Sequence, residues 1–125
     1  MVYLLDTNVI IRFLVGDHNE HLQIATEIFT KIENAEYEVE ILEPVIIEVL
    51  FVLVKFYKLP QAEVINDLKK IIALRGVMGD KVLLMETLNI VGEKNIDFVD
   101  ALICAKSKLQ GYEKLSFDHD VNKKC

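Results

Sequence analysis

Val2-Tyr3-Leu4-Leu5-Asp6-Thr7-Asn8 is the stretch that decides the fold. Four consecutive apolar residues followed at once by an acid predict a short buried strand that ends at Asp6. A helical segment over residues 8–15 follows, and Gly16 halts it. A buried strand that leads directly into a helix is typical of the repeating unit of a parallel α/β sheet.

The rest of the chain continues this alternation. Apolar spacings of three and four residues and Pro or Gly at segment ends predict further helices at 18–35, 43–57, 59–72, 81–91 and 97–110. Gly92 and Gly111 are expected to close the last two. Strands are predicted at 37–42 and 112–117, and a very short one within 75–80. We therefore predict an α/β fold with a central, mainly parallel sheet flanked by helices.

Length and charge limit the possible functions. The 125 residues fit one domain, and the last residues, from about 119, read as a short polar tail. The chain carries 14 Lys and Arg against 20 Asp and Glu, a net charge of −6. That balance excludes a protein that holds nucleic acid by diffuse basic attraction.

The cysteines and apolar runs predict a cytoplasmic, soluble protein. Cys104 and Cys125 lie far apart without His or Cys at metal-ligand spacing, so free thiols in a reducing compartment are expected. Asp6 interrupts the first apolar run, which argues against a signal peptide. The longest apolar run, 45–54, is too short to cross a membrane and contains Glu48.

Four carboxylates in apolar surroundings are the informative residues. They are Asp6, Glu48, Asp100 and Asp118. Asp6 and Asp118 follow predicted strands, the edge where ligands bind in open α/β sheets, and the other two lie in the first turns of predicted helices. Four acids that converge repel one another, so the cluster predicts a bound hard cation such as Mg²⁺ or Mn²⁺.

Structural alternatives remain open for each acid. Asp6 is as well explained as a helix N-cap, and Asp118 as the start of a turn. Capping is the better account of Asp97, with Asp100 the acid three residues on. Glu48 is the hardest to explain structurally, because Glu is almost never fully buried without a partner.

The ordered motifs resemble those of the PIN-domain ribonucleases, most closely the VapC-type toxins of toxin–antitoxin pairs. Asp6-Thr7-Asn8 after an apolar strand resembles the opening signature, and Glu48 within residues 44–49 resembles the second acid. Residues 98–103 around Asp100 resemble the third motif. Ser116-Phe117-Asp118-His119-Asp120 resembles the fourth, with Ser116 where Thr is more usual.

The resemblance implies a three-layer α/β/α fold and Mg²⁺- or Mn²⁺-dependent hydrolysis of RNA that leaves a 5′-phosphate. It implies Asp6, Glu48, Asp100 and Asp118 as catalytic and metal-binding acids, with Asp120 a possible substitute for Asp118. It also implies a homodimer and an antitoxin partner that covers an apolar groove.

Other residues are expected to support these acids. Thr7, Asn8 and Ser116 are candidates to hydrogen-bond the metal ligands, although backbone capping explains Thr7 and Ser116 equally well. Asp97 and Asp120 are candidate outer acids, and Arg12 is the best candidate to contact RNA. The alternative function is a catalytically inactive PIN-like module that binds metal, RNA or protein. Without the four acids, 14 positive charges face 16 negative ones, so the proposed site accounts for most of the surplus acidity.

Overall fold

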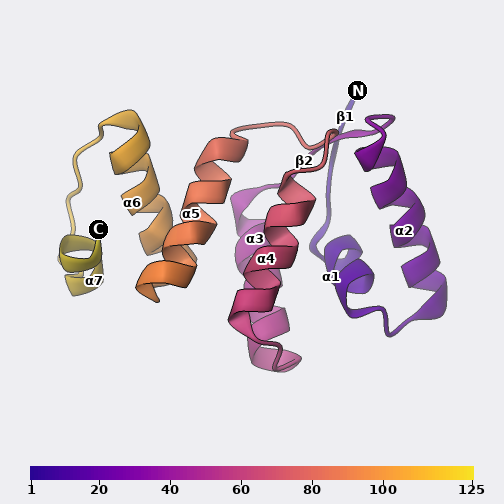
Figure 1. Ribbon diagram of the computed structural model, residues 1–125, viewed down its shortest axis with the longest axis horizontal. Helices are drawn as coiled ribbons and strands as arrows, with labels where there is room; N and C mark the ends of the chain where they lie inside the picture. Colours follow the sequence, from indigo (N-terminus) through magenta and orange to yellow (C-terminus); the bar gives the residue numbers. More distant parts are fainter. The chain divides into compact units, whose positions relative to one another are not determined.

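The computed structural model describes residues 1–125 as two compact units, unit 1 at residues 1–79 and unit 2 at residues 80–125. Unit 1 contains β1 (Val2–Leu4), α1 (Thr7–Val15), α2 (Asn19–Glu33), β2 (Glu38–Glu40), α3 (Glu43–Phe51), the π-helical η1 (Val52–Phe56) and α4 (Gln61–Ile72) (Figure 1). Unit 2 contains α5 (Lys81–Lys94), α6 (Phe98–Gln110) and α7 (His119–Lys124). The single domain predicted from the sequence stays a prediction.

The sheet of unit 1 is parallel, as predicted. β1 pairs with β2, and Tyr3 lies opposite Val39 in the register. Beyond β2, Val77 forms an isolated parallel bridge to Val39. The short strand predicted within residues 75–80 is therefore present as a single bridge.

Gly76 makes this close pairing possible. Its N–H donates to the carbonyl of Ile32 at 2.9 Å, and its carbonyl accepts from the N–H of Val39 at 2.8 Å. A Cβ at this position would lie 2.1 Å from the carbonyl oxygen of Tyr37. The chain therefore needs a residue without a side chain where it passes the end of α2.

The predicted helices are present, but two of their predicted features are wrong. α5 passes through Gly92 and ends at Asn95, which adopts the left-handed conformation at φ 55°. Asn tolerates this conformation, so Gly92 was not needed as the end signal. The helix predicted over residues 43–57 is α3 followed by η1 rather than one α-helix.

The apolar segment of residues 43–57 is buried on one face only. α3 buries Ile46 and Val49, and η1 buries Leu53, while Ile47 and Phe51 are exposed. Only one face of this segment therefore meets the core of unit 1, and apolar side chains on its other faces stay exposed.

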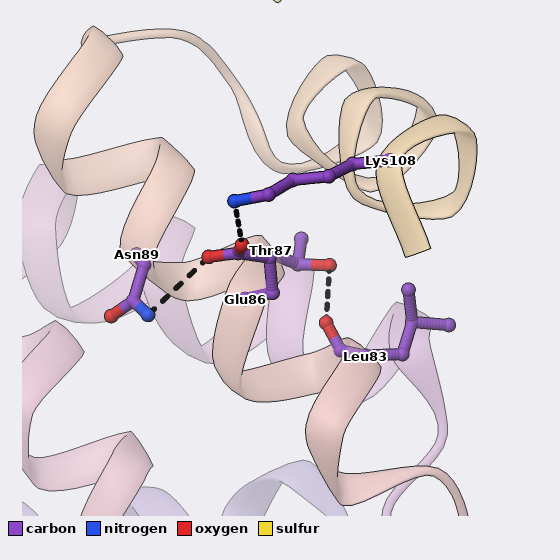
Figure 2. Close-up of polar contacts among 5 residues, drawn as sticks. All are labelled: Leu83, Glu86, Thr87, Asn89 and Lys108. Atoms are coloured by element: carbon purple, nitrogen blue, oxygen red, sulfur yellow. Dashed lines mark hydrogen bonds and ion pairs between the residues drawn. The ribbon is translucent and has the colours of Figure 1, made fainter. Parts of the chain in front are cut away.

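In unit 2, α5 and α6 pack side by side around a small apolar core. Leu88 and Ala101 are fully buried there. The buried Thr87 hydroxyl donates to the carbonyl of Leu83 at 2.7 Å, which satisfies its polar group within α5 (Figure 2). At the surface, Lys108 Nζ forms an ion pair with Glu86 Oε2 at 2.5 Å and joins the two helices.

The end of the chain differs most from the prediction. Residues 112–117 form no strand, and the elements of unit 2 are all helices. The expected polar tail is instead the short helix α7, and it buries Val121. The expected free thiols are wrong as well, since Cys104 and Cys125 form a disulfide with their Cα atoms 5.3 Å apart.

Candidate metal centre

Asp6 lies at the start of α1, two residues beyond β1. Its backbone is extended, with φ −82° and ψ 149°, and it occupies the N-cap position. Its side chain nevertheless accepts no capping hydrogen bond, and the residue is exposed. Asp6 therefore occupies the N-cap position of α1, but its carboxylate makes no capping hydrogen bond.

Glu48 lies on an exposed part of α3, which contradicts its expected burial. The buried Thr7 donates a hydrogen bond from Oγ1 to Glu48 Oε2 at 3.4 Å, across 41 residues of sequence. This contact brings the first and second acidic motifs together within unit 1. The predicted role of Thr7 in supporting a metal ligand stays a prediction, and this hydrogen bond to Glu48 is compatible with it.

Asn8 and Arg12 lie on the next turns of α1. Both line a shallow, largely apolar cavity of about 210 Å³ between α1 and α2. The Arg12 guanidinium also forms an ion pair with Asp17, with 3.3 Å between Nη1 and Oδ1. Asn8 makes no hydrogen bond to the candidate acids, and Arg12 shares its charge with a neighbouring carboxylate, so neither predicted role gains structural support.

Asp97 and Asp100 lie at the start of α6 in unit 2. Asp97 is the N-cap, and its Oδ1 accepts from the N–H of Asp100 at 2.9 Å. Capping is therefore the correct account of Asp97, as the sequence favours. Asp100 is not the capping residue of α6. Its backbone N–H is the group that the Asp97 side chain caps.

Asp118 and its neighbours form a second helix start in unit 2. Asp118 caps α7, with Oδ1 accepting from the N–H of Asp120 at 2.7 Å. Ser116 Oγ accepts from the N–H of Asp118 at 2.8 Å, and Asp120 forms an ion pair with Lys124 at 3.6 Å. Because residues 112–117 are not a strand, Asp118 begins a helix rather than following a sheet edge.

Three acids of unit 2 act electrostatically on Asp100. The pKa of Asp100 is raised above its ordinary value of 3.8, first by partial burial and then by the negative charges of Asp97, Asp118 and Asp120. Like charges around one carboxylate are the electrostatic setting in which a bound cation stabilises the ionised form. No cationic side chain is among the causes of this shift.

The donor set fits a hard cation in its chemistry. Each unit supplies exposed or half-buried carboxylates whose oxygens are the ligands that Mg²⁺ and Mn²⁺ prefer. No group of three or more His, Cys, Asp or Glu side chains is gathered as a metal site. Unit 1 brings Thr7 to Glu48, unit 2 brings Asp118 near Asp100, and the joint metal site of all four acids stays a prediction.

Two substitutions of Asp97 are expected to separate its contribution as the N-cap of α6 from its electrostatic effect on the pKa of Asp100. Asp97→Asn keeps a good N-cap, so the free energy of unfolding should change by only a few tenths of a kcal/mol, whereas Asp97→Ala should lose about 1 kcal/mol. Because one of the three repelling charges is gone, the pKa of Asp100 should fall in both variants. Urea denaturation and a ¹³C NMR titration of Asp100 measure the two quantities.

The sign of the pH effect follows from the raised pKa of Asp100. An acid whose pKa is higher in the folded chain stabilises the fold most below its unfolded value, and that contribution is lost as pH rises through the folded pKa. Asp97→Asn should therefore weaken this part of the pH dependence. An unchanged titration of Asp100 would contradict the proximity of the acids.

The family model of the PIN domain matches residues 3–125, which is nearly the whole chain. The chain belongs to the PIN domain family. A search of curated proteins found none that matches the chain.

Family membership confirms the predicted fold class. The parallel pairing of β1 and β2 among many helices is consistent with the three-layer α/β/α fold of PIN domains. PIN domains are generally nucleases, and they typically use divalent metals. No helix of the chain is long and apolar enough to span a membrane.

Proposed function

We propose that this protein is an endoribonuclease that depends on Mg²⁺ or Mn²⁺, with Asp6, Glu48, Asp100 and Asp118 as its catalytic acids. The observation that carries the proposal is in unit 1. The Asp6 carboxylate makes no capping bond, while the adjacent Thr7 hydroxyl reaches Glu48. Two motifs far apart in sequence thus meet through Thr7 and Glu48, and the residue before Thr7 is an acid without a capping bond, which supports the proposal.

A divalent ion bound to these carboxylates supplies Lewis-acid polarisation of the phosphodiester and a more acidic water nucleophile. We assign Asp6, Asp100 and Asp118 to the metal, and Glu48 either to the metal or to orienting the attacking water. Four carboxylates alone would repel an anionic RNA backbone, and that repulsion is why a cation is part of the proposal.

The supporting residues orient these acids. Thr7 fixes one oxygen of Glu48 through its hydroxyl, so that the other oxygen is free to accept a proton or a water hydrogen. In unit 2, Ser116 and the Asp120 N–H hold the backbone and the carboxylate of Asp118. Asp97 adds negative charge near Asp100 while it caps α6.

We further propose that the protein is the toxin of a toxin–antitoxin pair, a homodimer in its active form, and located in the cytoplasm. An apolar cavity lined by Val9, Ile24 and Ile28, with Ile24 56% exposed, supports an apolar contact with a protein partner. An antitoxin with a basic side chain would also complement the acids electrostatically.

The test is cleavage of single-stranded and structured RNA by the full chain. We expect cleavage with Mg²⁺ or Mn²⁺, its loss when EDTA is added, and its return when excess metal is restored. The products should carry 5′-phosphates, which ligation to an acceptor RNA detects. An equimolar EDTA–Mg²⁺ complex serves as the control for effects of the chelator itself.

Two results would overturn the proposal. Cleavage that continues unchanged in EDTA contradicts metal dependence. Thermal stabilisation by Mg²⁺ without turnover of any RNA identifies the alternative, an inactive module that keeps the fold and the cation.

A further inference from the structure

The disulfide between Cys104 and Cys125 joins the middle of α6 to the residue that follows α7. Cys104 is buried at 5% exposure, whereas Cys125 is exposed. One sulfur is therefore packed in unit 2 and the other belongs to a residue that meets solvent. In cells, such a bond in a protein of a reducing compartment is usually transient and sensitive to redox state.

α7 has little else to hold it. The hydrogen bonds and the ion pair of this segment join residues within 116–124 to one another, as between Asn122 and the carbonyl of Ser116 or between Asp120 and Lys124. With six residues, α7 is far shorter than a helix that is stable by itself in water. Its attachment to the rest of unit 2 depends on the buried Val121 and on the disulfide.

The attachment works against electrostatic repulsion. α7 packs against α6, and it begins at the acid Asp118 and includes Asp120, while the first turn of α6 carries Asp100. Without a bound cation, these like charges favour separation of the two helices. A covalent bond at the other end of α7 opposes that separation, because it shortens the distance through which α7 can move.

We propose that the Cys104–Cys125 disulfide is a redox-sensitive clamp that holds Asp118 of α7 beside Asp100 of α6. Its consequence for RNA cleavage rests on the function proposed above. In the oxidised chain the two acids are held ready for a cation, and in the reduced chain α7 is released and the acids separate. The clamp thus makes the oxidised form the active one.

The opening step needs a dithiol reductant. One thiolate of the dithiol attacks the exposed Cys125 sulfur, the bond to Cys104 breaks, and Cys104 leaves as a thiolate that takes up a proton. In the mixed disulfide, the first sulfur of the dithiol is bonded to the Cys125 sulfur. The second thiol of the same dithiol, as a thiolate, attacks that first sulfur, and Cys125 leaves as a thiolate that takes up a proton. Two electrons and two protons pass to the cysteines, and the dithiol becomes a disulfide.

The experiment compares the full chain after oxidation with glutathione disulfide and after reduction with dithiothreitol. Mass spectrometry should show that reduction adds two hydrogens. Amide hydrogen exchange of residues 116–124 should become faster by roughly tenfold on reduction, while exchange in the middle of α5 stays unchanged. The dissociation constant for Mn²⁺ should rise by roughly tenfold, because a carboxylate is no longer held in place.

Cys125→Ser supplies the matched control, because Cys125 is exposed and its loss leaves the buried Cys104 in place. This variant should resemble the reduced chain and respond to neither reagent. Thiols that stay free in the oxidant, or exchange in 116–124 that is the same in both states, would overturn the clamp.

RNA cleavage separates this inference from the proposed function. We expect reduction to lower the cleavage rate by roughly tenfold, in parallel with metal binding. Equal cleavage by both forms overturns the clamp as a regulator. If neither form cleaves RNA, the proposed function fails, and hydrogen exchange and Mn²⁺ binding still decide whether the clamp exists.

Discussion

Asp6→Asn is expected to lower the rate of RNA cleavage by about a hundredfold or more, because the proposed metal would lose a negatively charged ligand that helps it to stabilise the reacting phosphate. The fold should remain, since Asp6 is exposed and its side chain makes no capping bond in α1. Asn is in any case a good N-cap residue. Initial rates on one RNA at saturating Mg²⁺, with the thermal midpoint of each protein, provide the measurement.

Glu27→Gln is the matched control for this substitution. Glu27 is an exposed acid on α2, and it also loses one negative charge when it becomes an amide. Its cleavage rate should stay within about twofold of the unmodified chain, since a screened surface charge contributes little. Equal activity in both variants would contradict the assignment of Asp6.

Gly76→Ala is expected to destabilise unit 1 by about 3 kcal/mol or more, which is at the severe end for a single substitution. The new Cβ would lie 2.1 Å from the carbonyl oxygen of Tyr37 and 2.6 Å from that of Ile32. Both neighbours are backbone atoms, so no side-chain rotation relieves the clash. The chain would have to move away from α2, and the bridge between Val77 and Val39 would break.

Gly79→Ala provides the comparison for this prediction. Gly79 has φ +95°, but nothing lies within 4 Å of the position of a Cβ. Its cost is therefore backbone strain alone, about 1–2 kcal/mol. Urea denaturation should rank Gly76→Ala clearly below Gly79→Ala in stability, and the reverse order would show that the close approach at Gly76 does not limit the fold.

Most of the fold could be predicted because its signals are local. The period of apolar residues located the helices, and Asp97 and Gly111 marked the ends of α6 correctly. The strand predicted at 112–117 depended instead on a partner strand, which a local pattern does not reveal. Gly76 gave no usable signal either, since its necessity arises from the distant carbonyl of Tyr37.

The candidate site could be predicted in part for the same reason. Asp6 and Asp97 fall at helix starts, where sequence signals are strong, and the structure confirms both positions. The contact between Thr7 and Glu48 spans 41 residues and was expected only as a supporting role without a partner. Burial of Glu48 was inferred from its apolar neighbours and was wrong, because those neighbours occupy several faces of α3.

The disulfide shows the limit of composition. Two cysteines 21 residues apart carry no pairing signal by themselves, and the low cysteine content favoured free thiols. Their proximity depends on α7, a helix that was read as a polar tail. Without that helix, nothing in the sequence indicates that the end of the chain returns to α6.

The most direct test of the central claim compares one acid from each unit in the same cleavage assay. The unmodified chain, Asp6→Asn and Asp100→Asn are measured on one RNA at saturating Mg²⁺, after circular dichroism has shown that all three are folded. If acids of both units serve one metal-dependent reaction, each variant loses about a hundredfold or more in rate. A folded variant of either residue that cleaves RNA at the rate of the unmodified chain contradicts the account.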